Sequence, residues 1–186
     1  MADTPLPRPG LGAVRARLGE ILRVDHAGEL AAVHIYRGQR AVFERAPGRE
    51  GVAADLAEME AHEQVHLDRF DKLLTEQRVR PTLMAPVWRA AGFTLGVATA
   101  LMGEKAAHAC TEAVETVIED HYAGQISELK AREPALAAEL SQFRDDELAH
   151  RDHAVERGAR EAPAYRLLSA AIQAGCRAAI RISEKV

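Results

Sequence analysis

Hydrophobic and polar residues follow a helical period along four long stretches of the chain. Within each stretch apolar residues recur three, four and seven positions apart, the spacing that places side chains on one face of an α-helix. The stretches cover residues 11–44, 52–77, 103–132 and 134–157. Helix breakers separate them, since Pro47 and Gly48 follow the first, Pro81 follows the second and Pro134 opens the fourth. The pattern predicts an all-α fold built on a four-helix bundle.

Two further segments lie outside this pattern. Residues 81–103 are strongly apolar, and Arg89 is their only charged residue. The uncharged part is shorter than the ~20 apolar residues that a membrane-spanning helix needs, so we expect either a buried crossover between bundle helices or a segment lying in a membrane interface. Residues 165–182 set three arginines among leucine, isoleucine and alanine, which predicts an additional amphipathic C-terminal helix.

Composition agrees with one helical domain. The 186 residues are 47% hydrophobic but only 4% aromatic, and scarce aromatic residues favour helices over strands. We expect a disordered N-terminal tail at 1–15, rich in proline and without a secretory signal, and one domain at 16–186 in a bacterial cytoplasmic protein. The net charge of -4 gives no reason to expect a nucleic-acid partner.

A repeated motif is the strongest chemical signal in the sequence. A lone glutamate on one helix is followed by Glu-x-x-His on the next, and the arrangement occurs twice. The six residues are Glu29, Glu63, His66, Glu115, Glu147 and His150. On the third helix Glu112 and Glu119 lie on faces adjoining that of Glu115, whose neighbours at helical spacing are the more apolar. The duplication predicts a near-symmetric bundle with these side chains inside.

Carboxylates within an apolar core need a cation, because an unpaired buried carboxylate takes up a proton instead of staying charged. Four glutamates and two histidines offset most of the charge of two metal ions, as in the ferritin-like di-iron carboxylate proteins. The ligand types suit iron or manganese and do not separate the two metals. Asp146, beside Glu147, is either a surface residue or a hydrogen-bond partner that orients a ligand histidine.

Other metal sites are less consistent with the sequence. Residues 62–66 match His-Glu-x-x-His, in which His62 and His66 would bind zinc and Glu63 would act as the base of a protease. That interpretation leaves the second Glu-x-x-His motif unexplained. Cys110 and Cys176 are far apart and are expected to be small buried thiols.

Several segments resemble the demethoxyubiquinone hydroxylases of ubiquinone biosynthesis. They are Val24–Glu29 (VDHAGE), Arg78–Thr82 (RVRPT), Phe143–Glu147 (FRDDE), Ala162–Tyr165 (APAY) and Ile172–Arg177 (IQAGCR). The resemblance runs from about Leu18 to the C-terminus. It implies the same six metal ligands and favours Glu115 over its neighbours. It also implies that His121, Tyr122 and Arg177 lie near the quinone.

The resemblance implies an O2-dependent monooxygenase with two iron ions. Its substrate would be a polyprenylated methoxy-methyl-benzoquinol, which is hydroxylated on the ring. The apolar segments then suggest a membrane-facing entrance for this lipid quinol, in a protein attached peripherally to the cytoplasmic face of the inner membrane. A homodimer or a lipid-presenting partner protein would also suit these segments.

The source of electrons and two alternative functions stay open. No Gly-rich dinucleotide motif follows a predicted strand, so electrons come from NADH without a Rossmann domain, from the quinol, or from an external reductase. A ferritin-like iron-storage or peroxide-reducing protein would need no apolar entrance. A tRNA-nucleoside di-iron hydroxylase would need a basic surface. A helical interaction module would bind no metal.

Overall fold

The computed structural model describes residues 11–186, and this part of the chain folds into helices without a strand. The helices are α1 (Leu11–Phe43), α2 (Glu50–Gln77), α3 (Ala85–Leu101), α4 (Glu104–Leu129), α5 (Pro134–Glu156) and α6 (Tyr165–Ser183), with a short 3-10 helix, η1 (Ala159–Glu161), before α6. The all-α prediction is confirmed. Residues 1–10 of the predicted tail lie outside the described residues, and residues 11–15 are the start of α1.

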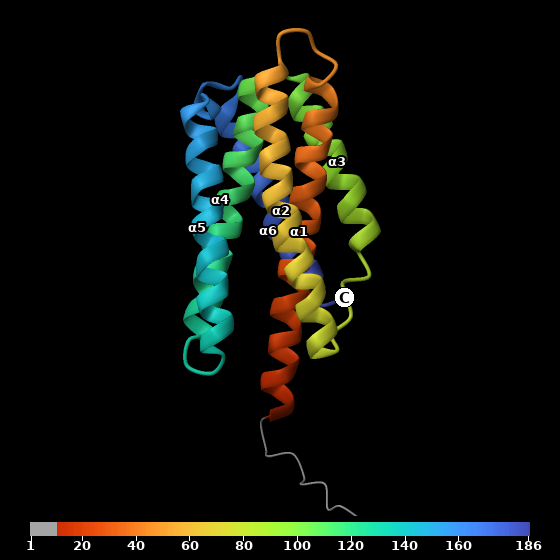
Figure 1. Cartoon of the computed structure of the whole chain (residues 1–186), viewed down its shortest axis with the longest axis vertical. Helices are drawn as coiled ribbons and strands as arrows, with labels where there is room; N and C mark the ends of the chain where they lie inside the picture. Colours follow the sequence, from red (N-terminus) through yellow and green to blue (C-terminus); the bar gives the residue numbers. More distant parts are fainter. Residues whose placement is uncertain (1–10) are drawn as a thin grey trace, which may run out of the picture.

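The bundle consists of two helix pairs, each followed by an outer helix. Helix α1 packs against α2, and α4 packs against α5. The third helix of each half then returns to the first, since α3 packs along α1 and α6 packs along α4. Figure 1 shows α3 on the outside of α1, at the edge of the bundle. The repeat seen in the sequence is therefore a repeat of three helices.

The apolar segment at 81–103 forms a true helix with one exposed face. A Cβ added at Gly96 would lie 2.1 Å from the backbone oxygen of Ile35, and one at Gly92 would lie 2.6 Å from that of Ala31. The two glycines therefore let α3 lie directly on the backbone of α1. The opposite face leaves Val87 exposed, so the segment is not a fully buried crossover. Among residues 11–186, no helix combines the length and hydropathy needed to cross a bilayer.

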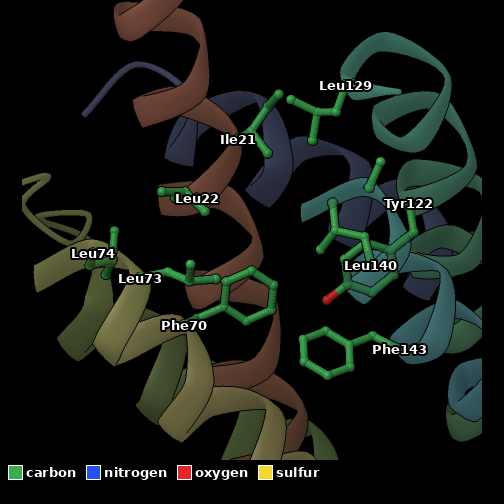
Figure 2. Packing of buried hydrophobic residues seen from close by; sticks show 10 residues of the cluster. Ile21, Leu22, Phe70, Leu73, Leu74, Tyr122, Leu129, Leu140 and Phe143 are labelled. Carbon is green, nitrogen blue, oxygen red and sulfur yellow. The ribbon is translucent and has the colours of Figure 1, made fainter. Parts of the chain in front are cut away.

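Two apolar clusters fill the bundle at different heights. The larger one joins Phe70 of α2 and Leu140 of α5, both fully buried, to residues of α1 and α4 (Figure 2). The second gathers around Phe43 and Leu56 at the other end of α1 and α2. Each fully buried side chain of this size contributes about 1.5–3 kcal/mol to stability. On α1, α2 and α4 the predicted ligand positions lie between these two clusters, so apolar packing on both sides fixes these helices around them.

Candidate metal centre

The structure brings all six predicted ligand residues together inside the bundle. Each of the four long helices contributes to the group, and every member is at most 5% exposed. They are Glu29 on α1, Glu63 and His66 on α2, Glu115 on α4, and Glu147 and His150 on α5. Burial follows from the sequence, because each residue falls on the apolar face of its helix.

The six side chains form two overlapping groups, each able to hold one metal ion. One group, here position A, contains Glu29, Glu63, His66 and Glu147, and the other, position B, contains Glu63, Glu115, Glu147 and His150. Within each group, one ligand atom per residue lies within 4.8 Å of the others. Glu63 and Glu147 belong to both groups, so these two carboxylates are placed to bridge two ions.

Hydrogen bonds distinguish the bridging glutamates from the terminal ones. The Tyr122 hydroxyl donates to Oε1 of Glu29, and the Tyr36 hydroxyl donates to Oε1 of Glu115 at 2.7 Å. The Oε2 atoms of these two glutamates have no hydrogen-bond partner. Glu63 and Glu147 have no hydrogen-bond partner on either oxygen. A terminal ligand needs one free oxygen and a bridging ligand needs two, so the unpaired atoms match a two-metal site.

The two histidines present the same ring atom to the site. Nδ1 of His66 lies 3.4 Å from Glu147 and 3.6 Å from Glu29, while Nδ1 of His150 lies 3.0 Å from Glu63. Both Nδ1 atoms are buried without a hydrogen-bond partner. Their Nε2 atoms face outward and are held by neighbouring side chains. This arrangement fixes each ring with Nδ1 directed at the metal positions.

Burial and neighbouring charges shift the pKa values of several predicted ligand residues. Burial, reinforced by the nearby carboxylates, raises the pKa of Glu63 and of Glu115 well above the ordinary value. Burial disfavours the charged form of His66, but the carboxylates of Glu147 and Glu29 near its Nδ1 outweigh this effect and raise its pKa to about 11. Without a metal these groups would retain protons, which a metal ion must displace on binding. Buried carboxylate and imidazole groups of this kind can hold a metal ion.

The remaining predicted residues fall in three different places. Asp146, with its side chain 56% exposed, lies 3.1 Å from Nε2 of His66, which is the orienting position considered for it. Tyr122 is buried against Glu29. His121 and Arg177 line a separate surface pocket of about 400 Å³ between α4 and α6. Tyr122 therefore lies at the centre itself and does not share that pocket.

Two contacts at the centre do not follow from helical spacing alone. The hydroxyl of Tyr36, a residue of α1, donates to Glu115 of α4. His62 is exposed, and its Nδ1 lies 3.3 Å from Nε2 of His150. His62 belongs to neither of the two groups among residues 11–186 that could hold a metal ion. The zinc-protease interpretation therefore fails, because His62 and His66 do not converge on one point.

An apolar cavity of about 540 Å³ lies against α1 and α4, the helices that carry Glu29 and Glu115. It is lined by α1, α3, α4 and α6, and none of the described residues that line it is charged. Gly28 and Val114 line this cavity and are the chain neighbours of Glu29 and Glu115. At another point of the wall, Nε1 of Trp88 donates to the Ser183 hydroxyl at 2.9 Å, which ties α3 to α6. The two outer helices therefore form one part of the cavity wall, and α1 and α4 form the rest.

Comparison with known proteins identifies the family. The family model described as "Ubiquinone biosynthesis protein COQ7" matches residues 16–183. A relative from Rhodospirillum rubrum, named 3-demethoxyubiquinol 3-hydroxylase, is 50% identical over 178 residues, which cover 96% of this chain and 82% of the relative. The mouse NADPH-dependent 3-demethoxyubiquinone 3-hydroxylase is 47% identical over 175 residues, covering 92% and 79%. The Saccharomyces cerevisiae 5-demethoxyubiquinone hydroxylase is 39% identical over 190 residues, covering 94% and 80%. The resemblance noted in the sequence is confirmed, and the chain belongs to the COQ7 family of ubiquinone biosynthesis proteins.

Proposed function

We propose that this protein hydroxylates the ring of demethoxyubiquinol, a polyprenylated methoxy-methyl-benzoquinol, in ubiquinone biosynthesis. The observation that carries the proposal is the uncharged cavity, whose wall adjoins a carboxylate and histidine centre. An apolar cavity of this size takes up part of a long prenyl tail by removing it from water. Family membership supports the same substrate, because the three relatives above bear the names of demethoxyubiquinol or demethoxyubiquinone hydroxylases.

We propose iron as the metal, held at positions A and B. A bound iron pair supplies the binding and reduction of dioxygen. The protein keeps this chemistry dry, since every ligand is buried beneath packed helices. Tyr36 and Tyr122 hold the terminal glutamates by hydrogen bonds, so their free oxygens keep a fixed direction. The cavity wall is open at Gly28, the chain neighbour of Glu29, because a Cβ there would meet no atom within 4 Å.

The substrate's tail also suggests where the protein works. Helix α3 leaves Val87 and Leu101 exposed, and α6 leaves Leu167 exposed. Arg166 and Arg181 lie on α6, where they can contact acidic headgroups. We propose peripheral attachment to the cytoplasmic face of a bacterial inner membrane through these two helices. A second copy of the chain or a lipid-presenting protein would cover the same apolar side chains.

Electrons are proposed to come from a reduced nicotinamide dinucleotide, directly or through a separate reductase. The name of the mouse relative includes NADPH dependence. Within residues 11–186 there is no strand, and so no βαβ unit to bind a dinucleotide.

The test is the quinone profile of cells that lack this protein, extracted and measured by mass spectrometry. We expect demethoxyubiquinone to accumulate, and the intact gene to restore ubiquinone. The Glu63→Ala variant should fail to restore it, because it removes a bridging carboxylate. Glu58→Ala, an exposed change on the same helix, should restore it fully. A normal quinone profile in the deletion strain would overturn the proposal and would favour the storage or tRNA-modifying alternatives.

A further inference from the structure

The two ligand histidines have different outer partners. Nε2 of His66 lies 3.1 Å from the carboxylate of Asp146, whereas Nε2 of His150 lies 3.3 Å from the imidazole of His62. The rings of His62 and His150 lie nearly parallel, with an interplanar angle of 14° and centroids 5.5 Å apart. The two halves of the bundle therefore hold equivalent histidines with unlike groups.

These partners occupy equivalent places in the repeat. His62 directly precedes Glu63, and Asp146 directly precedes Glu147. Each one reaches across the bundle to the histidine of the other motif, so the pairing is crosswise: α5 supplies the partner of His66, and α2 supplies the partner of His150. The difference between the two positions thus depends on one residue in each motif.

The two partners affect a metal ligand differently. When Nδ1 of a histidine binds a metal, Nε2 carries the ring proton and donates it to its partner. A carboxylate partner makes the ring a stronger donor to the metal. A neutral imidazole can also accept the proton, but it brings no charge, and only one of its two tautomers has a free Nδ1. A histidine held by an imidazole is therefore a weaker metal ligand than one held by a carboxylate.

We propose that His62 is a positioning residue for His150, and that the pairing of His62 and Asp146 makes the two metal positions unequal. Position A, with Glu29 and His66, binds its ion more tightly. Position B, with Glu115 and His150, fills second and loses its ion first. This inference rests on the proposed two-metal centre but does not depend on the identity of the substrate.

The test measures metal binding and does not depend on turnover. Metal-free protein is titrated anaerobically with Fe(II) in competition with a chromogenic chelator, and two binding steps are fitted. We expect two unequal steps in the unmodified protein. His62→Leu, which removes the acceptor, should weaken only the second step by about 10–100-fold. His62→Asp, which copies the other half of the repeat, should strengthen the second step and bring the two steps together.

Controls separate the proposal from a general structural effect. His34→Leu changes a histidine that is outside the metal groups and whose Nδ1 is hydrogen-bonded to the backbone oxygen of Leu30, and it should leave both steps unchanged. Crystals loaded with one equivalent of iron should show anomalous density at position A alone. Equal loss of affinity in both steps of His62→Leu, no loss in either, or density first at position B would each overturn the inference. An unmodified protein that binds no Fe(II) would instead overturn the proposed metal centre.

Discussion

The close backbone contact between α3 and α1, two helices that line the cavity, can be tested by one substitution. A Cβ added at Gly96 would lie 2.1 Å from the backbone oxygen of Ile35 and 3.0 Å from the backbone nitrogen of Gln39. Both are main-chain atoms of a long helix, so no side-chain rotation relieves the overlap. The Gly96→Ala variant can accept its methyl group only if the two helices move apart.

The expected magnitude follows from two opposing effects. Overpacking of this kind costs about 1–3 kcal/mol, or more where backbone must shift. Alanine returns at most about 1 kcal/mol through its better helix propensity. We expect the free energy of unfolding to fall by about 1–3 kcal/mol, which lowers the melting temperature by about 2–12 °C for a domain of this size.

The control is a glycine with free space around it. A Cβ at Gly124, within α4, would meet no atom within 4 Å, so Gly124→Ala should be stabilising by up to about 1 kcal/mol. Both variants are compared with the unmodified protein by urea denaturation of the metal-free form. If Gly96→Ala is as stable as the unmodified protein while Gly124→Ala behaves as expected, the close approach of α3 to α1 is refuted.

Three further predictions concern the centre, the cavity and a buried histidine. Glu63→Gln should stabilise the metal-free protein at pH 7 by at most about 3 kcal/mol, because it removes a carboxyl that must be protonated on folding. In thermal melts, iron should stabilise this variant much less than it stabilises the unmodified protein. Gly28→Leu should fill the cavity beside Glu29 and reduce turnover of a long-tailed quinol at least tenfold, with iron content by elemental analysis unchanged. His108 is 2% exposed, and burial lowers its pKa to about 4. Protonation therefore favours the unfolded chain, and stability that is full above pH 6.5 should fall by up to about 3 kcal/mol as the pH drops toward 4, a loss that His108→Gln should remove in urea denaturation.

The Glu63 and Gly28 variants each have a matched control and a result that would contradict the prediction. Exposed Glu58→Gln should change neither the stability of the metal-free protein nor the effect of iron, and a Glu63→Gln variant less stable than the unmodified metal-free protein would contradict the first. Gly124→Leu should leave turnover unchanged, and full activity of Gly28→Leu would place the substrate elsewhere.

The pH prediction depends on the charges around His108. Glu104 lies on its own helix, Asp55 on α2, His153 on α5, and Arg157 directly after the end of α5. The two acids raise the pKa and the two bases lower it, so burial decides the direction. The relevant quantity is the difference in the free energy of unfolding between the unmodified protein and His108→Gln at each pH. The contributions of the other titrating groups cancel in this difference. A difference that stays constant from pH 7 to pH 4.5 would contradict the reasoning.

Much of the fold could be predicted from the sequence because the bundle helices carry strong local signals. The predicted stretches 134–157 and 165–182 agree to within one residue with the helices Pro134–Glu156 and Tyr165–Ser183 of the structure. The segment that became α3 was not predicted to be a helix, since its residues are apolar on nearly every side and give no clear period. Its placement is determined by Gly92 and Gly96, whose role is apparent only when the backbone of α1 lies against them.

Periodicity could bring the six acidic and basic ligand residues together but could not say what holds each one. Helical spacing states which face a side chain occupies, whereas the bond from Tyr36 to Glu115 requires the relative rotation of α1 and α4. The same holds for His62 and Asp146, since either could have faced solvent on its own helix. Their crosswise contacts arise only when α2 and α5 are set face to face across the centre. The repeat therefore specifies a symmetric set of ligands, and the residue before each Glu-x-x-His motif is where that symmetry is broken.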